Sequence, residues 1–145
     1  MSDLVFLDTS AYLCILLGEA AASKLSKWLE GKALCCSTLL WVETERNLVH
    51  MTRQKLLSSE DYQSAFTQVR QDVELFLCQE ITLGLCLSGE FPAVKIPRSN
   101  DLIHLCSALW FFRNRKLKGF VSLDEDQKQA AAEMGLPVLD LFQKK

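Results

Sequence analysis

The sequence predicts an α/β fold whose central sheet is mainly parallel. Short apolar runs, such as residues 4–7 (LVFL), alternate with longer segments whose apolar residues recur at helical spacing. A continuous apolar run is typical of a strand buried on both faces, as strands are in a parallel sheet. The chain has 145 residues, of which 49% are hydrophobic. We therefore expect one domain with a single core over residues 1–145.

In the first half of the chain, the elements follow from helix caps and apolar spacing. Thr9 and Ser10 are candidate N-caps for the first helix, and Gly31 ends the second. Between residues 62 and 76 the apolar positions are spaced by four, three, four and three residues, which is a helical stripe. These signals predict strands at residues 4–7 and 34–36, and helices at about residues 10–17, 19–30, 38–56 and 59–76.

In the second half, Ser99 is the candidate N-cap of a long helix, and Gly135 ends the last helix. The prolines and glycines between residues 84 and 97 leave that segment without a predicted element. The remaining patterns predict strands at residues 80–83, 119–123 and 138–141, and helices at about residues 100–113 and 127–134.

The composition excludes several classes of protein. A net charge of -2 provides no chain-wide positive field, which excludes a generally basic nucleic-acid binder. The six cysteines include no C-x-x-C pair, so we interpret them as reduced core residues and expect no zinc ribbon or redox motif. The N-terminal segment lacks the features of a secretory signal, and no apolar stretch approaches the ~20 residues of a bilayer span. We therefore expect a cytoplasmic protein.

Acidic residues stand where predicted strands end and predicted helices begin. Asp8 follows the first strand, and Asp124 follows a later one, with Asp126 two residues beyond. Glu43 and Asp101 lie near the starts of two helices. Because the carboxyl ends of parallel strands meet at one edge of a sheet, we expect these acids to converge. Converging carboxylates repel each other unless a cation is present, and an all-oxygen set favours Mg²⁺ or Mn²⁺ over zinc.

Each acid taken alone also has a purely structural interpretation. Asp8 is a candidate helix cap, and Asp101 is placed to complement a helix dipole. Asp124 and Asp126 are typical turn residues, and Glu43 has arginines in reach for a surface ion pair. The ordered set, rather than any single member, favours a shared metal site.

Five segments resemble, in order, the motifs of the PIN-domain nucleases. Residues 7–11 (LDTSA) resemble the first motif, and residues 37–43 (STLLWVE) resemble the second, with a serine six positions before the glutamate. Residues 100–109 (NDLIHLCSAL) resemble the third, and residues 120–126 (FVSLDED) resemble the fourth. Residues 135–138 (GLPV) match the usual closing strand. The chain length is similar to that of the compact VapC-like toxins of toxin–antitoxin systems.

The resemblance implies a three-layer α/β/α PIN-like fold with a central, mainly parallel sheet of about five short strands. It implies an endoribonuclease that uses Mg²⁺, with Mn²⁺ as the alternative ion, to cleave RNA phosphodiester bonds and leave 5′-phosphate and 3′-hydroxyl ends. Ser122 stands where the family more often has threonine. The residues carried over are Asp8, Glu43, Asp101 and Asp124 as catalytic and metal-binding acids, Asp126 as a fifth metal ligand, and Ser10 and Ser122 as supporting hydroxyls.

The resemblance also implies partners. An RNA substrate needs cationic contacts, for which the candidates are Arg46, Arg98, Arg113 and Arg115, although Arg113 and Arg115 equally fit a solvated helix end. An RNA-cleaving toxin requires restraint, so we expect a small VapB-like antitoxin. We also expect a homodimer. The antitoxin is expected in a groove near Leu13, Leu16, Leu17 and Trp28.

Other functions fit the sequence less well. A phosphatase of the haloacid dehalogenase type needs Asp-x-Asp after its first strand, but Ser10 occupies the second position. A phosphoacceptor receiver domain needs paired acids at the end of an early strand, and Asp3 lies on the wrong side of that strand. A PIN-like binding module without catalysis, and a housekeeping RNA-processing nuclease, remain as alternatives.

Overall fold

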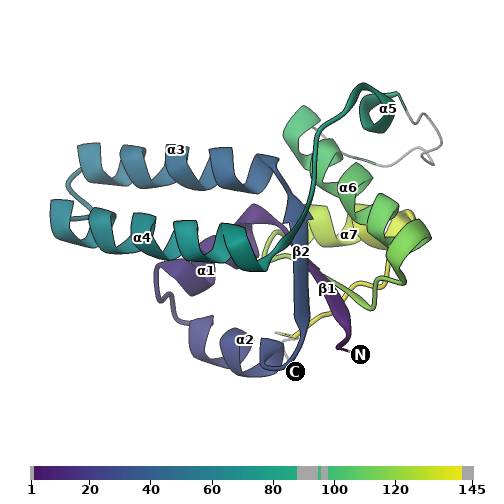
Figure 1. Ribbon diagram of the computed structural model, residues 1–145, viewed down its shortest axis with the longest axis horizontal. Coiled ribbons are helices and arrows are strands. Elements are labelled where there is room, and N and C mark those ends of the chain that lie inside the picture. Colours follow the sequence, from purple (N-terminus) through teal and green to yellow (C-terminus); the bar gives the residue numbers. More distant parts are fainter. Residues whose placement is uncertain (1, 88–94, 96–97, 142–145) are drawn as a thin grey trace.

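Four short parallel strands form the central layer of the fold (Figure 1). The computed structural model describes residues 2–87, 95 and 98–141. Within that part of the chain, the strand order is β3-β2-β1-β4, so the N-terminal strand lies inside the sheet. Every pairing is parallel, which brings the carboxyl ends of all four strands to one edge. The strands are β1 (Leu4–Leu7), β2 (Ala33–Ser37), β3 (Leu77–Gln79) and β4 (Gly119–Val121).

Seven helices are formed by the described residues. Ser58 caps one of them by accepting a hydrogen bond from the backbone of Asp61 at 3.0 Å. Asp8, rather than Thr9 or Ser10, caps the first helix, and Ser99 is a helical residue rather than the cap. The helices are α1 (Thr9–Leu16), α2 (Ala22–Leu29), α3 (Leu39–Arg53), α4 (Ser59–Leu75), α5 (Leu83–Cys86), α6 (Ser99–Arg115) and α7 (Glu125–Glu133).

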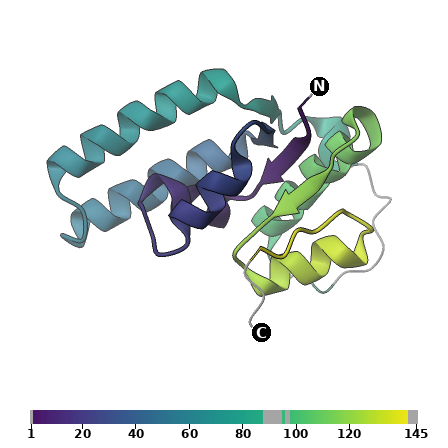
Figure 2. The ribbon, with the colours of Figure 1, turned by 90° about the horizontal axis from the view of Figure 1, so that it is seen from below.

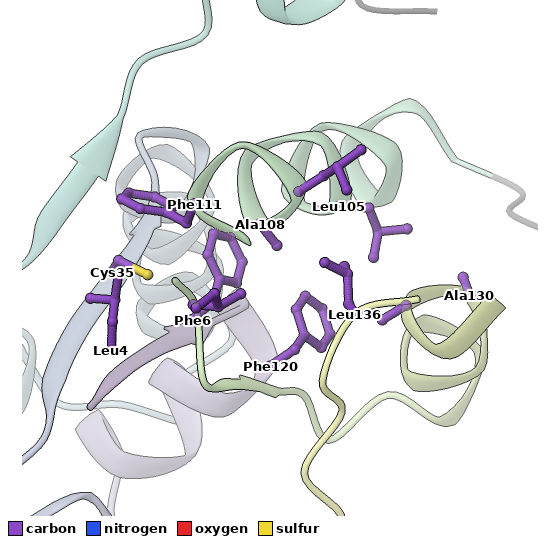
Figure 3. Close-up of a cluster of buried hydrophobic side chains, with 12 residues drawn as sticks. Leu4, Phe6, Cys35, Leu105, Ala108, Phe111, Phe120, Ala130 and Leu136 are labelled. Atoms are coloured by element: carbon purple, nitrogen blue, oxygen red, sulfur yellow. The ribbon is translucent and has the colours of Figure 1, made fainter. Parts of the chain in front are cut away.

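Helices cover both faces of the sheet, which confirms the predicted three-layer arrangement. On one face, Phe6 of β1 and Phe120 of β4 stack at 5.6 Å and pack against Leu105 of α6 and Leu136 (Figure 3). On the other face, the strands pack against α1, α2 and α4. The α3–α4 hairpin extends well beyond the sheet to one side (Figure 1, Figure 2).

The third strand was predicted at the wrong residues. β3 ends at Gln79, whereas the prediction placed this strand at residues 80–83. The reason is a helix cap: the Thr82 hydroxyl accepts a hydrogen bond from the backbone of Leu85 at 3.1 Å and starts α5. Residues 80–82 therefore lead into a short helix instead of forming a strand.

The predicted fifth strand, residues 138–141, is reduced to one parallel bridge between Val138 and Phe120. The Phe120 amide donates to the carbonyl of Pro137 at 2.8 Å, and the Leu139 amide donates to the Phe120 carbonyl at 3.0 Å. Gly119 allows this close approach, since a Cβ there would lie 2.2 Å from Leu139 Cδ1. The sheet therefore has four full strands and this bridge at the β4 edge.

Most of the six cysteines are buried in the core. Cys14, Cys35, Cys36 and Cys106 are buried as predicted, whereas Cys78 is half-buried and Cys86 is exposed. Of the segment 84–97 that carried no predicted element, residues 88–94 and 96–97 lie outside the described residues. No helix in the described part of the chain is both long and apolar enough to cross a membrane.

The stacked pair at the centre of the sheet predicts the effect of a core substitution. Phe120 is fully buried, so Phe120→Ala should lower the free energy of unfolding by about 3–5 kcal/mol. Phe112→Ala is the matched control, since Phe112 is 42% exposed and its removal should cost less than about 1 kcal/mol. Urea unfolding followed by circular dichroism measures both. Equal losses in the two variants would contradict this account of the core.

Candidate metal site at the carboxyl edge of the sheet

Asp8 is buried at the end of β1, with an exposed fraction of 4%. Its Oδ1 accepts hydrogen bonds from the Ser10 hydroxyl at 2.7 Å and from the Ala11 amide at 3.1 Å. Its Oδ2 accepts from the Ser122 hydroxyl. Since Ser122 follows β4, the neighbour of β1 in the sheet, the parallel pairing of the two strands brings the two side chains together.

The same two hydroxyls fix the loop that follows β4. Ser10 accepts a hydrogen bond from the Leu123 amide at 2.9 Å, and Ser122 accepts one from the Asp124 amide at 3.0 Å. Asp124 then caps α7, with its Oδ1 accepting from the Asp126 amide at 2.9 Å. The loop therefore places Asp124 at the edge of the sheet where Asp8 lies.

Glu43 is held by partners from two other helices. Thr9 of α1 donates its hydroxyl to Glu43 Oε1 at 2.8 Å, and His104 Nε2 of α6 lies 2.5 Å from the same oxygen. Burial raises the pKa of the Glu43 carboxyl, but the hydrogen bonds from His104 and Thr9 outweigh it, so the pKa lies below its ordinary value. His104 is 3% exposed and serves as a hydrogen-bonding residue.

Asp101 lies in the first turn of α6, where other acids surround it. Burial raises the pKa of its carboxyl above the ordinary value, and the charges of Asp124 and Glu43 raise it further. The charges of Arg98 and His104 act in the opposite direction. These interactions place the carboxylates of α3, α6 and the β4–α7 loop within electrostatic reach of one another.

A hydrogen bond also fixes α7 against α6. Gln127, which is buried, donates its side-chain amide to the carbonyl of Asp101 at 3.0 Å. This bond ties the first turn of α7, which follows Asp124, to the first turn of α6, which carries Asp101. The residue next to Gln127, Asp126, is exposed on the same turn.

The acids converge without forming a closed set of ligands. Among the described residues, no three His, Cys, Asp or Glu side chains lie close enough together to hold a metal ion. The oxygen-only donors suit a hard cation, and the repulsion that raises the pKa of Asp101 is what a divalent cation would relieve. The donor chemistry of this edge thus suits a divalent ion, and Asp101 lies within electrostatic reach of Asp124.

The four candidate RNA-contacting arginines fall into two groups. Arg98 precedes Asp101 closely enough to lower its pKa, and exposed Arg46 lies on α3 just after Glu43. Arg113 and Arg115 are exposed at the other end of α6. At the rise of an α-helix, Arg113 lies about 18 Å along the axis from Asp101. The structure therefore does not bring this second group to the acidic edge.

The sequence did not indicate the roles of two residues at this edge. Thr9 was interpreted only as a helix cap, but its hydroxyl binds Glu43. Gln127 was not singled out, although it links α7 to α6. Their only sequence signal is proximity, since Thr9 directly follows Asp8 and Gln127 lies three residues after Asp124.

The buried state of Asp8 predicts a pH-dependent effect of Asp8→Asn. Burial raises the folded-state pKa of Asp8, against the hydrogen bonds of Ser122 and Ser10 that lower it. Asp8 therefore contributes stability below its unfolded pKa of about 4, and this contribution is lost as the pH rises through the folded pKa. In chelator, Asp8→Asn should match the wild type in acid and be equally or more stable at pH 7.

Urea unfolding across a pH series measures this difference, with Asp3→Asn as the control because Asp3 is exposed. A variant that is less stable than the wild type at pH 7, by an amount that disappears in acid, would contradict the raised pKa and show that Asp8 acts as an ionised helix cap.

Comparisons with known proteins agree with this arrangement. The model of the PIN domain family matches residues 5–133. Among solved structures, the chain is similar to the Mycobacterium tuberculosis toxin VapC20, a sarcin–ricin loop-cleaving toxin, with a TM-score of 0.57 and 15% identity over 87% of this chain and 94% of that one. No sequence among the curated proteins matches. The likeness to VapC20 shows a shared fold, and the family match covers most of the chain, which therefore belongs to the PIN-domain family.

Proposed function

We propose that this protein is a metal-dependent endoribonuclease that acts in the cytoplasm as the toxin of a toxin–antitoxin pair. The observation that carries the proposal is the convergence of Asp8, Glu43, Asp101 and Asp124 at one edge of a parallel sheet in a PIN-domain chain. Hydrogen bonds position the carboxylates of Asp8, Glu43 and Asp124 at this edge. Such a set suits hydrolysis assisted by a metal ion.

In this proposal, Asp8, Asp101 and Asp124 hold Mg²⁺ directly or through water, and Mn²⁺ is the alternative ion. Glu43 and Asp126 complete the ligand set or orient the attacking water. When bound, the ion supplies charge neutralisation of the scissile phosphate and a more acidic water.

The protein's own contribution is to hold the acids in place before substrate arrives. Ser10 and Ser122 fix both oxygens of Asp8. Thr9 and His104 engage one oxygen of Glu43. Arg98 is placed to bind a phosphate beside Asp101, which an acidic protein needs in order to attract RNA.

Asp101→Asn tests the shared site. The substitution keeps the size of the side chain but removes a charge that the proposal assigns to the ion, so RNA cleavage in Mg²⁺ should fall by more than about 100-fold. The rise in melting temperature on adding Mg²⁺ should also shrink, because the ion binds the folded form more weakly. Cleavage of a labelled RNA and thermal unfolding provide the two measurements.

Asp3→Asn is the matched control and should leave both quantities unchanged, since Asp3 is exposed and precedes the amino end of β1. An Asp101→Asn variant that cuts RNA at the wild-type rate would overturn the assignment. A wild-type protein that binds RNA but cuts none in Mg²⁺ or Mn²⁺ would favour the binding module.

A groove beside α1 supports the antitoxin part of the proposal. A cavity of about 450 Å³ between α1, α2 and α4 is lined by Leu16 and Phe76, and a second cavity of about 450 Å³ continues it past Leu16 and Leu17. Leu13 and Trp28, also expected there, are not among the lining residues. The acidic residues along the groove are Glu30, Asp61 and Asp72. We infer a partner segment with apolar and basic side chains.

Leu16→Asp tests this groove. Because Leu16 lines both cavities, a carboxylate there should weaken binding of the proposed small antitoxin by about tenfold or more. Leu75→Asp is the control, since Leu75 is 75% exposed and lies outside the groove. Calorimetric titration with the purified partner measures both. Equal binding to Leu16→Asp and to the wild type would place the partner elsewhere.

We also propose that the protein forms a two-fold dimer, as expected from the resemblance to compact PIN-domain toxins. Exposed apolar side chains such as Val42 and Leu56 on the α3–α4 hairpin are compatible with such a contact. A monomer by light scattering at micromolar concentration would contradict the dimer.

A further inference from the structure

Two cysteines face each other across the β2–β3 edge of the sheet. Cys36 and Cys78 are direct partners in the parallel register, and their sulfur atoms lie 3.4 Å apart. Neighbouring strands are about 4.8 Å apart, which lies inside the range of Cα separations that a disulfide spans. A disulfide between these residues therefore needs a small sulfur movement and no change of register.

The thiols of Cys36 and Cys78 differ in acidity because their surroundings differ. The Trp41 indole donates a hydrogen bond to the Cys78 sulfur at 3.0 Å, and the Cys36 thiol lies within hydrogen-bonding distance of the same sulfur. The hydrogen bond with Cys36 is the main cause that lowers the pKa of Cys78 to about 6. Burial raises this pKa, whereas the hydrogen bond from Trp41 lowers it further. The same contact and burial raise the pKa of Cys36.

The two thiols also differ in solvent exposure, and the more acidic one is the more exposed. Cys78 is half-buried on the edge strand β3, whereas Cys36 is fully buried on β2. A partly exposed thiolate beside a buried thiol is the arrangement of an oxidisable cysteine with its resolving partner. The pair is 42 residues apart in sequence, so no C-x-x-C spacing reveals it.

We propose that Cys36 and Cys78 form a peroxide-sensitive dithiol site that converts reversibly to an intramolecular disulfide. The site is separate from the acidic edge, and it does not depend on the proposed nuclease activity. The oxidant is a hydroperoxide, of which hydrogen peroxide is the simplest.

The reaction has two steps. The Cys78 thiolate attacks one peroxide oxygen, so that an S–O bond forms, the O–O bond breaks, and the departing hydroxide takes a proton to become water. Cys78 is then a sulfenic acid, oxidised by two electrons. The Cys36 sulfur attacks the Cys78 sulfur, the S–O bond breaks, and the oxygen leaves as a second water with the Cys36 proton. A small thiol restores both cysteines by exchange.

Trp41 acts as a positioning residue for the first step. Its ring also packs on Tyr12 and Phe76, at 5.5 Å from each ring centre. Trp41→Phe keeps an aromatic ring but removes the N–H that stabilises the thiolate. Oxidation of Cys78 should therefore slow several-fold in this variant, and the folded structure should persist.

The experiment uses the full-length, reduced protein treated with a small excess of hydrogen peroxide. After free thiols are blocked, peptide mass mapping should show one major cross-linked pair, Cys36 with Cys78, which disappears on treatment with dithiothreitol. In Cys36→Ser, dimedone should instead trap sulfenic acid on Cys78. Cys86→Ser is the control, and it should leave the yield of the cross-link unchanged because Cys86 is exposed elsewhere on the chain.

The wild-type peptide map decides the proposal even if a cysteine variant fails to fold. Absence of the Cys36–Cys78 cross-link in the oxidised wild type overturns it. Dimedone labelling of Cys86 as fast as of Cys78 in folded Cys36→Ser also overturns it, because the Cys78 environment would then confer no reactivity.

Discussion

The hydrogen bonds that Ser10 and Ser122 donate to Asp8 are the contacts on which the acidic edge depends. They fill both oxygens of a buried carboxylate, which would otherwise carry a large desolvation cost. The same hydroxyls accept from the backbone of Leu123 and Asp124, so they also set the course of the loop after β4. One cluster therefore joins two strands, a loop and two helix starts.

The structural roles of these acids are compatible with the functional roles that we propose for them. Asp8 and Asp124 each cap a helix through one oxygen. A cap is the structural role that the sequence suggested for Asp8, whereas it suggested a turn residue for Asp124. The caps also hold the carboxylates at the edge where Asp101 experiences the charge of Asp124. A helix cap tolerates neutral replacements such as asparagine or serine, whereas a metal ligand requires the charge, so charge-neutral substitutions separate the two roles.

Most of the fold follows from local patterns, and the errors have two sources, an unrecognised helix cap and contacts between helices that are distant in sequence. The buried strand at residues 4–7 and the helical stripe over residues 62–76 are found as predicted, because apolar spacing alone specifies them. The third strand was misplaced because Thr82 favours a helix cap over continued pairing. Convergence of the acids was predictable from parallel strand ends. The contact of Thr9 and His104 with Glu43 was not, because it requires the packing of three helices.

The position of β1 inside the sheet has a consequence for synthesis on the ribosome. β1 is made first, but its neighbour β4 begins at Gly119, and the partners Asp8 and Ser122 are 114 residues apart. A nascent chain that stops before this point has no donor from β4 for the buried carboxylate. Contacts of such long sequence separation form late and slowly. Translation products that end before Ser122 therefore lack an assembled acidic edge.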